Sequence, residues 1–435
     1  MIPAVTASEY IYSKLGSNAS LLPLFVKDMA NSTGLTIGSY ITGKDVEGKD
    51  RFIDEFGTQA IWLGGIPFFK KFTDLTLYKL LGVDPKFDVR NLKNKEILEK
   101  AIEKSPTEQI KQSITKASKN PKYTKNLALA KFGFSTFAAI FTYAGLTKFR
   151  QNYRLNEAKE KLKANRKSKI KNFHNFYTQK VPKAFSSVHK NKKDVSFSGS
   201  IQDFMFNPVQ NLMILDGSIT AERLASSQSR QEFINYTIKE GGTWFFMYFA
   251  GAMIKKHFEN KSKVPIKLDS MIIESKELPQ AFKDGSIKSS LDDYSKKISQ
   301  NAKDIDIYNF IHENPDNFIV KMAKQSKLIK TLKNSDKIDT RAFIDINEFK
   351  NLKSDIEELY NKAPKDSVDK YLKQVVKAKR CAVLKNIGIC IGALGVAVPA
   401  LMIALRYILP NNREYKVMEM AKQENQKENS LSKTA

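Results

Sequence analysis

The sequence predicts a mainly α-helical membrane protein with two related halves, each pairing a short apolar helix with a longer membrane helix. Three observations support this prediction: strand-like alternation is scarce, two apolar segments have the length of membrane helices, and one apolar pattern occurs twice. The chain has 435 residues, of which 42% are hydrophobic. It is therefore long enough for two or three domains and for a sizeable core.

The N-terminal region, 1–125, is predicted to be helical and contains a short apolar run, 56–69. In EFGTQAIWLGGIPFFKK, Glu55 to Lys71, fourteen uncharged residues separate a glutamate from a lysine pair. As a helix this run is about 21 Å long, whereas the hydrocarbon core of a bilayer is about 30 Å thick. We therefore expect a helix that docks at or into the bilayer without crossing it straight.

Two longer spans are predicted to be membrane helices. Segment 126–147, NLALAKFGFSTFAAIFTYAGLT, is interrupted only by Lys131, whose ammonium group is close enough to the end to reach the headgroups. Segment 386–405, NIGICIGALGVAVPALMIAL, is twenty uncharged residues between Lys385 and Arg406. Helices of soluble proteins rarely stay apolar on every face over such a length.

A basic connector, 148–194, follows the first span. Fifteen Lys or Arg residues stand against two Glu residues from position 148 to 193, so this segment carries +13 of the formal net charge of +26. Because it follows a membrane span directly, anionic lipid headgroups are its expected partner. Binding of nucleic acid is the weaker alternative, suggested by Phe173, Phe176 and Tyr177 among the lysines. The candidate basic residues are Arg154, Lys161, Lys163, Arg166, Lys167, Lys169 and Lys171.

Region 195–385 is predicted to be a second helical region with a short apolar run, 241–254. A helix break is expected near Asp216-Gly217. Further along, Asp345 and Glu348 fit an N-terminal capping box. The apolar stripe that follows them is expected to be core, and its members are Phe349, Leu352, Ile356, Leu359 and Tyr360.

The two short runs follow one plan. EGGTWFFMYFAGAMIKK, Glu240 to Lys256, repeats the order of Glu, any residue, Gly, Thr, an uncharged run and Lys-Lys at an offset of 185. Glu55 and Thr58 thereby correspond to Glu240 and Thr243. Further downstream, Lys86, Asp88, Lys95 and Glu96 correspond to Lys267, Asp269, Lys276 and Glu277.

Three interpretations of the short runs remain open: an interfacial helix, a buried hairpin arm of a soluble subdomain, and a segment that enters the membrane without crossing. Glu55 and Glu240 are expected to lie at helix starts, where an acid interacts with the helix dipole. A pair of ion-carrying carboxylates is the alternative role for them.

Sequence motifs for catalysis and for cofactor binding are lacking. GSYITGKD, Gly38 to Asp45, departs from the phosphate-binding loop because an aspartate stands where Ser or Thr is needed. The four histidines and two cysteines show no metal-ligand spacing. We therefore expect no catalytic residue, no metal and no cofactor. Without a catalytic motif, the sequence favours a non-enzyme over an enzyme.

Basic residues around the two spans predict the sidedness of the chain. More of them follow the first span than precede it, and more precede the last span than follow it. Both comparisons place 148–385 in the cytoplasm of a multi-pass protein of the cell membrane. Segment 406–435 is expected to be a polar tail.

Several stretches resemble a family of uncharacterised membrane proteins from gut-dwelling, non-photosynthetic relatives of cyanobacteria. They are RFIDEFGTQAIWLGGIPFFKK, FDVRN, FMFNPVQN, SITAERL and EFINYTIKEGG. The resemblance implies a bacterial membrane protein and no particular chemistry. We therefore expect a membrane-anchored structural or interaction protein, with a transporter or ion pathway built from the duplicated halves as the alternative.

Overall fold

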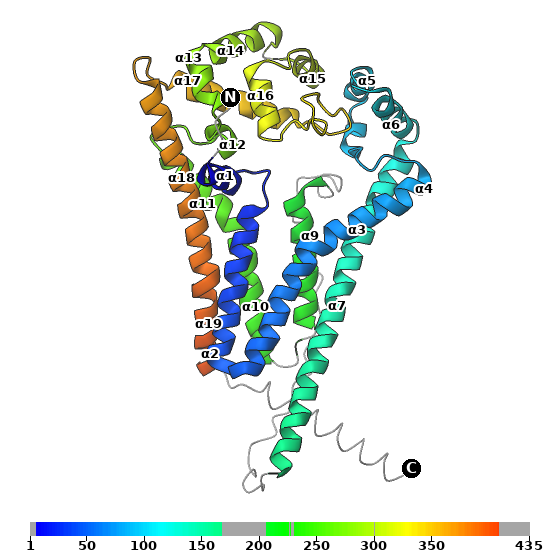
Figure 1. The fold of residues 1–435 in the computed structure, drawn as a ribbon, viewed down its shortest axis with the longest axis vertical. Helices are drawn as coiled ribbons and strands as arrows, with labels where there is room; N and C mark the ends of the chain where they lie inside the picture. The colour runs from blue at the N-terminus through cyan, green and yellow to red at the C-terminus, as the bar shows by residue number, and fades with distance from the viewer. Residues whose placement is uncertain (1–5, 168–205, 226, 228–229, 300, 409–435) are drawn as a thin grey trace.

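The computed structural model describes residues 6–167, 206–225, 227, 230–299 and 301–408. It confirms a mainly helical protein: within these ranges no strand occurs, and one isolated bridge joins Thr331 to Ile338. Long helices form a bundle, and short helices form a head that covers one end of it (Figure 1).

The bundle contains five long helical stretches and the shorter segments that continue them. Its elements are α2 (Leu22–Ala60), the π-helix η1 (Ile61–Gly65), α3 (Ile66–Thr73), the π-helix η2 (Asp74–Tyr78), α4 (Lys79–Leu81), α7 (Pro121–Lys167), α9 (Pro208–Ala225), α10 (Arg230–Trp244), the π-helix η4 (Phe245–Ala250), α11 (Gly251–Lys261), α18 (Val368–Gly392), the π-helix η5 (Ala393–Ala397) and α19 (Val398–Ile408).

The head is assembled from two segments that are distant in sequence, 82–120 and 262–367. Its helices are η3 (Val89–Lys93, 3₁₀), α5 (Lys95–Glu103), α6 (Glu108–Lys119), α12 (Ser270–Ile273), α13 (Glu277–Lys283), α14 (Ser286–Lys297), α15 (Asp304–Glu313), α16 (Phe318–Gln325) and α17 (Ile346–Asn361). Helix α1 (Ala7–Leu15) contacts α12 of the head and α2 of the bundle.

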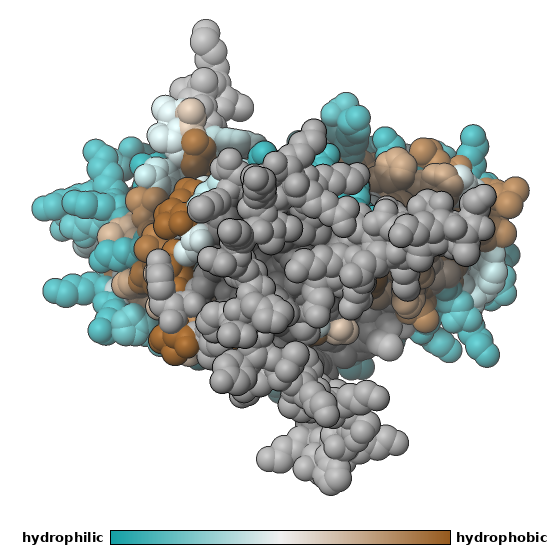
Figure 2. All heavy atoms as spheres, turned by 90° about the horizontal axis from the view of Figure 1, so that it is seen from below, coloured by the Kyte–Doolittle hydropathy of each residue, from teal (hydrophilic) through white to brown (hydrophobic). Residues whose placement is uncertain are grey.

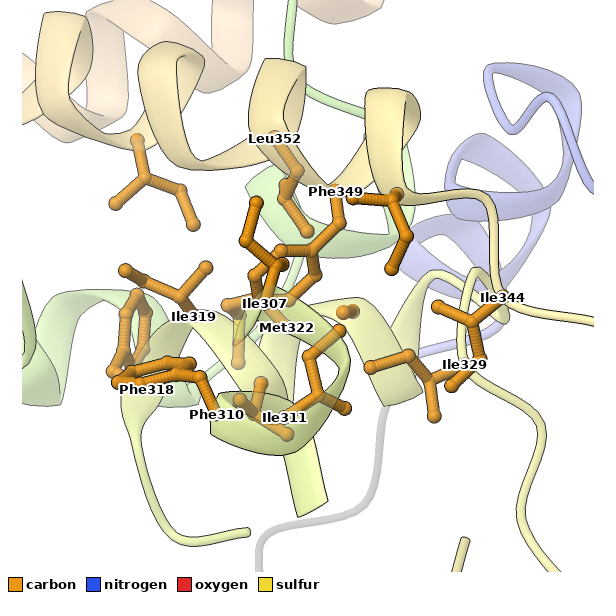
Figure 3. Close-up of a cluster of buried hydrophobic side chains, with 14 of the residues drawn as sticks. Ile307, Phe310, Ile311, Phe318, Ile319, Met322, Ile329, Ile344, Phe349 and Leu352 are labelled. Carbon is orange, nitrogen blue, oxygen red and sulfur yellow. The ribbon is translucent and has the colours of Figure 1, made fainter. Parts of the chain in front are cut away.

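Aliphatic and aromatic side chains from both head segments form one continuous core. Figure 3 shows the part of this core that segment 262–367 contributes. Helix α17 shows how its sequence produces this packing. The carboxylate of Asp345 accepts hydrogen bonds from the backbone N–H groups of Asn347 and Glu348, so the Asp345 half of the predicted capping box is present. Phe349 and Ile356 of the predicted stripe are then fully buried in the core.

The outer faces of the bundle are apolar. Large hydrophobic side chains are exposed along the long helices, among them Ile41, Phe68, Phe72, Phe137, Phe141, Phe249, Met253, Ile389, Val396 and Leu401. Seen from the end opposite the head, apolar residues gather on both sides of the molecule (Figure 2). Among the described residues, two helical stretches are long and apolar enough to cross a membrane, Pro121–Glu160 and Val368–Leu405.

Glycines let the bundle helices approach closely. A Cβ atom at Gly34 of α2 would lie 2.1 Å from the backbone oxygen of Gly395 in η5. Gly38, four residues later, faces Pro399 and Ile403 of α19. This is the close packing that small residues at four-residue spacing allow in helix pairs.

Helix α2 turns back on itself at the end of the bundle away from the head (Figure 1). A Cβ atom at Gly48 would lie 2.3 Å from the Tyr40 ring, although eight residues of straight helix rise about 12 Å. Residues 22–40 therefore descend from the head and residues 48–60 return toward it.

Both short runs are parts of longer helices. Glu55 lies inside α2 and Glu240 inside α10, so the prediction that they occupy helix starts is wrong. The glutamates that precede the two runs, Glu55 and Glu240, are buried inside the bundle, and the helix continues past them. The predicted break at Asp216-Gly217 is also wrong, because α9 continues through it. Gly217 instead makes room for Trp244, whose ring would lie 3.1 Å from an added Cβ.

Candidate functional site: a buried polar centre

Seven charged residues meet inside the bundle, and we call them the polar centre. They come from four helical segments: Asp50, Asp54 and Glu55 of α2, Arg150 of α7, Arg223 of α9, and Lys239 and Glu240 of α10. All seven are buried. Because an isolated buried charge is very costly, the arrangement depends on mutual pairing.

Lys239 joins the two glutamates that the repeated pattern singled out. Its ammonium nitrogen lies 2.7 Å from Glu55 Oε1 and 3.0 Å from Glu240 Oε1. The side chain of Lys239 is only 1% exposed, and those of Glu55 and Glu240 are 5% and 8% exposed. One lysine, directly before the second repeated pattern, thus bridges the glutamates that precede both short runs.

Arg223 connects the same glutamate to the next carboxylate. Its guanidinium donates to Glu240 Oε1 at 2.5 Å and to Asp54 Oδ1 at 3.1 Å. It also donates to the hydroxyl oxygens of Tyr143 at 2.7 Å and Thr58 at 3.2 Å. Planar guanidinium groups suit such multiple, geometrically fixed contacts.

Arg150 completes the network on the side of α7. It lies 2.6 Å from Asp54 Oδ1 and donates to both carboxylate oxygens of Asp50 at 3.1 Å. Arg154, one turn further along α7, lies 3.5 Å from Asp50. This member of the basic connector is therefore directed into the bundle.

The other connector candidates are less fully described. Lys161, Lys163, Arg166 and Lys167 belong to the helical backbone of α7, and Lys169 and Lys171 lie outside the described residues. The span 126–147 and the first part of the connector thus form one continuous helix.

A cavity of about 30 Å³ lies beside the polar centre. It is large enough for one or two water molecules, since a water needs roughly 10–15 Å³ of such volume. Glu55, Thr58, Glu240 and Thr243 all line it. The four positions that the repeat paired across 185 residues are therefore brought together.

Two further carboxylates, Asp28 and Asp216, line the same cavity. The Tyr248 hydroxyl donates to Asp216. Besides Lys239 Nζ, which forms ion pairs, three buried polar atoms at the cavity have no hydrogen-bond partner among the described residues: Asn31 Oδ1, Thr243 Oγ1 and Trp244 Nε1. Such atoms suit an ordered water or another small polar guest.

Each short run contains a π-helical segment at the matching position. η1 begins six residues after Glu55, and η4 begins five residues after Glu240. π-Helical turns leave the regular hydrogen-bond pattern and occur frequently at functional sites. Both segments lie on the head side of the polar centre, where Trp62 and Met247 are part of the bundle core.

In the described part of the chain, no cluster of three or more His, Cys, Asp or Glu side chains is arranged to hold a metal ion. The carboxylates are engaged by cations, so they are suited to hold helices together or to pass a proton or small ion rather than to attack a substrate.

Sequence reasoning missed Asp50, Asp54, Arg150, Arg223 and Lys239. The local signal for Asp50 and Asp54 is weak, because they lie one turn apart and beside Arg51 in a charged stretch that resembles an exposed helix face. The partners of the missed residues are up to 184 residues apart, as in the Lys239–Glu55 contact, so no local pattern pairs them.

No family model, curated protein or solved structure matches this chain. The polar centre and the fold are therefore the basis for functional inference.

Proposed function

We propose that this protein is a membrane-anchored structural or interaction protein whose bundle lies in the bilayer and holds the head at the membrane surface. One observation carries the proposal: the bundle has charges inside and apolar side chains outside. Only 28% of the most apolar stretch of each candidate membrane helix is buried in the protein, whereas the core helix of a soluble protein is mostly buried. Lipid is the solvent that suits such faces.

The depth of the polar centre supports this proposal. Gly242, next to Glu240 in α10, packs against Val398 in the apolar segment 386–405. The ion pairs thus lie at the level of this segment, in its half away from the head. Charges at that depth must pair with one another inside the bundle, and the seven residues do so.

The course of the chain supports a duplication into related halves. In each half an ascending helix with a π-helical segment leads to a head segment, which is followed by a long apolar helix that returns (Figure 1). Asp88 caps η3 and Asp269 caps α12 after the matching lysine pairs. Asp28 and Asp216 lie on the descending helices that precede the two ascending ones. The two halves run in the same direction, as in parallel repeats.

This arrangement changes the sidedness expected from the sequence. The start of the connector and head segment 262–367 lie at opposite ends of the bundle (Figure 1). In a bundle that spans the membrane they face opposite sides, so 148–385 is not a single cytoplasmic region. Lys and Arg are denser in the connector, with 15 in the 46 residues of 148–193, than in 262–385, with 25 in 124 residues. We therefore assign the connector end to the cytoplasm.

Membrane extraction tests the anchor. We expect the protein to stay in the pellet after alkaline carbonate treatment and to require detergent for release. Val396→Asp places a charge on an outward face that is 67% exposed in η5, at a cost of about 2.5–3.5 kcal/mol in lipid. Tyr10→Asp on α1, 59% exposed, is the matched control. Equal membrane yields for the two variants, or a soluble wild-type monomer, would contradict the proposal.

An ion pathway through the polar centre is the second candidate function. It is favoured by the cavity, where carboxylates of both halves meet three unpartnered polar atoms. Proteoliposomes that contain a pH-sensitive dye measure it. Proton flux that falls in Glu55→Gln and Glu240→Gln, with unchanged protein incorporation, would support a pathway. Flux equal to that of protein-free liposomes would leave the anchor as the function.

A further inference from the structure

A second cavity lies between the head-side ends of α3, α7 and α9. Its volume is about 410 Å³, within the range of roughly 300–1,000 Å³ typical of small-molecule sites. Its walls are mainly apolar and aromatic and include Trp62, Ile66, Phe132 and Leu212. Two lysines, Lys70 and Lys131, also line it.

The charges around this cavity are unbalanced. Lys131 pairs with Asp74, and its ammonium nitrogen lies 5.0 Å from the centre of the Tyr78 ring. The side chain of Lys70 is half-buried, and its ammonium group forms no hydrogen bond or ion pair with any described residue. A cation in an apolar surround is stabilised by an anion. No carboxylate lines the cavity, and Asp74, which lies outside its lining, pairs with only one of the two lysines.

The cavity has a charged end near the head and an apolar end further from the head. Trp62 lies eight residues before Lys70, about 12 Å further from the head along the helix. Lys131 is six residues into segment 126–147, close to its head-side end. The charged part therefore lies where lipid headgroups begin, and the apolar part extends toward the middle of the bilayer.

We propose that this cavity binds an anionic phospholipid, with its phosphate at Lys70 and Lys131 and one acyl chain along Trp62, Ile66 and Leu212. The binding free energy comes from burial of the acyl chain and from the charge-assisted contacts of the two lysines. A zwitterionic lipid has the same chains without net charge, so the site favours the anionic headgroup. The inference rests on the proposed location of the bundle in a bilayer.

Quenching of tryptophan fluorescence by brominated lipids tests the site. The chain has two tryptophans, so Trp244→Phe leaves Trp62 as the only reporter. The protein is reconstituted in vesicles that contain dibrominated phosphatidylglycerol or dibrominated phosphatidylcholine. We expect stronger quenching by phosphatidylglycerol, and Lys70→Gln should weaken this preference about tenfold.

The neighbouring Lys71 provides a matched control, since it is exposed and does not line the cavity. Lys71→Gln should keep the preference. Equal quenching by the two lipids, or equal loss in both lysine variants, would overturn the site. Quenching by dibromostearate without quenching by phosphatidylglycerol would also overturn it, because the ligand would then be a free fatty acid.

Two measurements separate the site from the membrane proposal and from misfolding. Flotation with vesicles reports membrane insertion, so flotation without preferential quenching refutes the lipid site alone, whereas failure to float refutes the membrane proposal as well. Ala128→Phe fills the cavity from α7. If this variant melts like the wild type, it should lose the preference, and retention of the preference would place the lipid elsewhere.

Discussion

At the scale of residues, Lys239 shows how the bundle tolerates charge. It contacts two carboxylates that each have another cation nearby, Arg51 for Glu55 and Arg223 for Glu240. Because the pairs share partners, removal of one residue leaves its neighbours partly compensated. The network thus tolerates the substitution of one charged residue better than an isolated buried pair does. Each such substitution still leaves a buried charge without one of its partners.

Replacement of Lys239 by Met should therefore destabilise the protein by about 3 kcal/mol, near the lower limit for breaking a buried ion pair. Adding Glu55→Gln should recover part of this loss, because it removes the carboxylate left without its main partner. Lys256→Met, at an exposed position of α11, is the control and should be nearly neutral. Thermal unfolding in detergent measures all three, and a Lys239→Met variant as stable as the control would contradict this role.

His312 of the head should make stability depend on pH. Its pKa is lowered from the ordinary 6.5 to about 4, mainly by burial and also by Lys104 and Lys324, while Glu313 opposes the shift. Between these values the unfolded chain binds a proton that the folded protein does not. The stability contribution is therefore complete above pH 6.5 and is lost progressively as the pH falls toward 4.

Wild type should lose about 1–2 kcal/mol from this group between pH 7 and pH 5. His312→Gln should remove that part of the pH dependence, whereas His257→Gln, at an exposed site, should retain it. Melting temperatures at the two pH values provide the comparison. Parallel curves for wild type and His312→Gln would show that His312 is not protected from protonation.

At the scale of elements, the bundle depends on how closely its helices approach. The contact of Gly34 with Gly395 joins α2 to η5, and no side chain fits between them. Gly388 of α18 offers the opposite case, because nothing lies within 4 Å of a Cβ added there.

Alanine should therefore have opposite effects at these two glycines. Gly34→Ala should destabilise the protein by about 1–3 kcal/mol, because a helix must move to admit the methyl group. Gly388→Ala should be neutral or stabilising by up to about 1 kcal/mol, since it raises helix propensity without a clash. Thermal unfolding measures both variants, and a stabilising Gly34→Ala would argue against close contact between α2 and η5.

At the scale of the whole molecule, the fold separates the head from the connector end by the length of the bundle. Cys381 is exposed near the head, and Cys390 is buried in the apolar span. In sealed vesicles an impermeant maleimide should label Cys381 from one side and should not label Cys390. In a Cys381→Ser background, Asn152→Cys at an exposed position of α7 should be labelled only from the other side. Labelling of Cys381 and of the cysteine at position 152 from the same side would instead support the sequence-based prediction that 148–385 is one cytoplasmic region.

The agreement between sequence and structure follows from the range of the interactions. Helical content, the two long apolar helices and the cap at Asp345 depend on residues a few positions apart, and all were predictable. The break expected at Gly217 was wrong because that glycine is required for packing against Trp244, 27 residues away, and not for a turn. Glu55 and Glu240 were recognised as a pair by their repeated context, but their shared partner Lys239 was not.

The sequence by itself determined that the chain is helical, that two of its helices are apolar enough for a bilayer, and that its positive charge concentrates in 148–193. Only the tertiary structure decided which charges are buried, where the repeated runs meet and which ends of the helices lie together. The reason is physical. Periodicity and hydropathy are properties of a few turns of chain. An ion pair requires two atoms within about 4 Å in space, and the two residues that supply them can be any distance apart in the sequence.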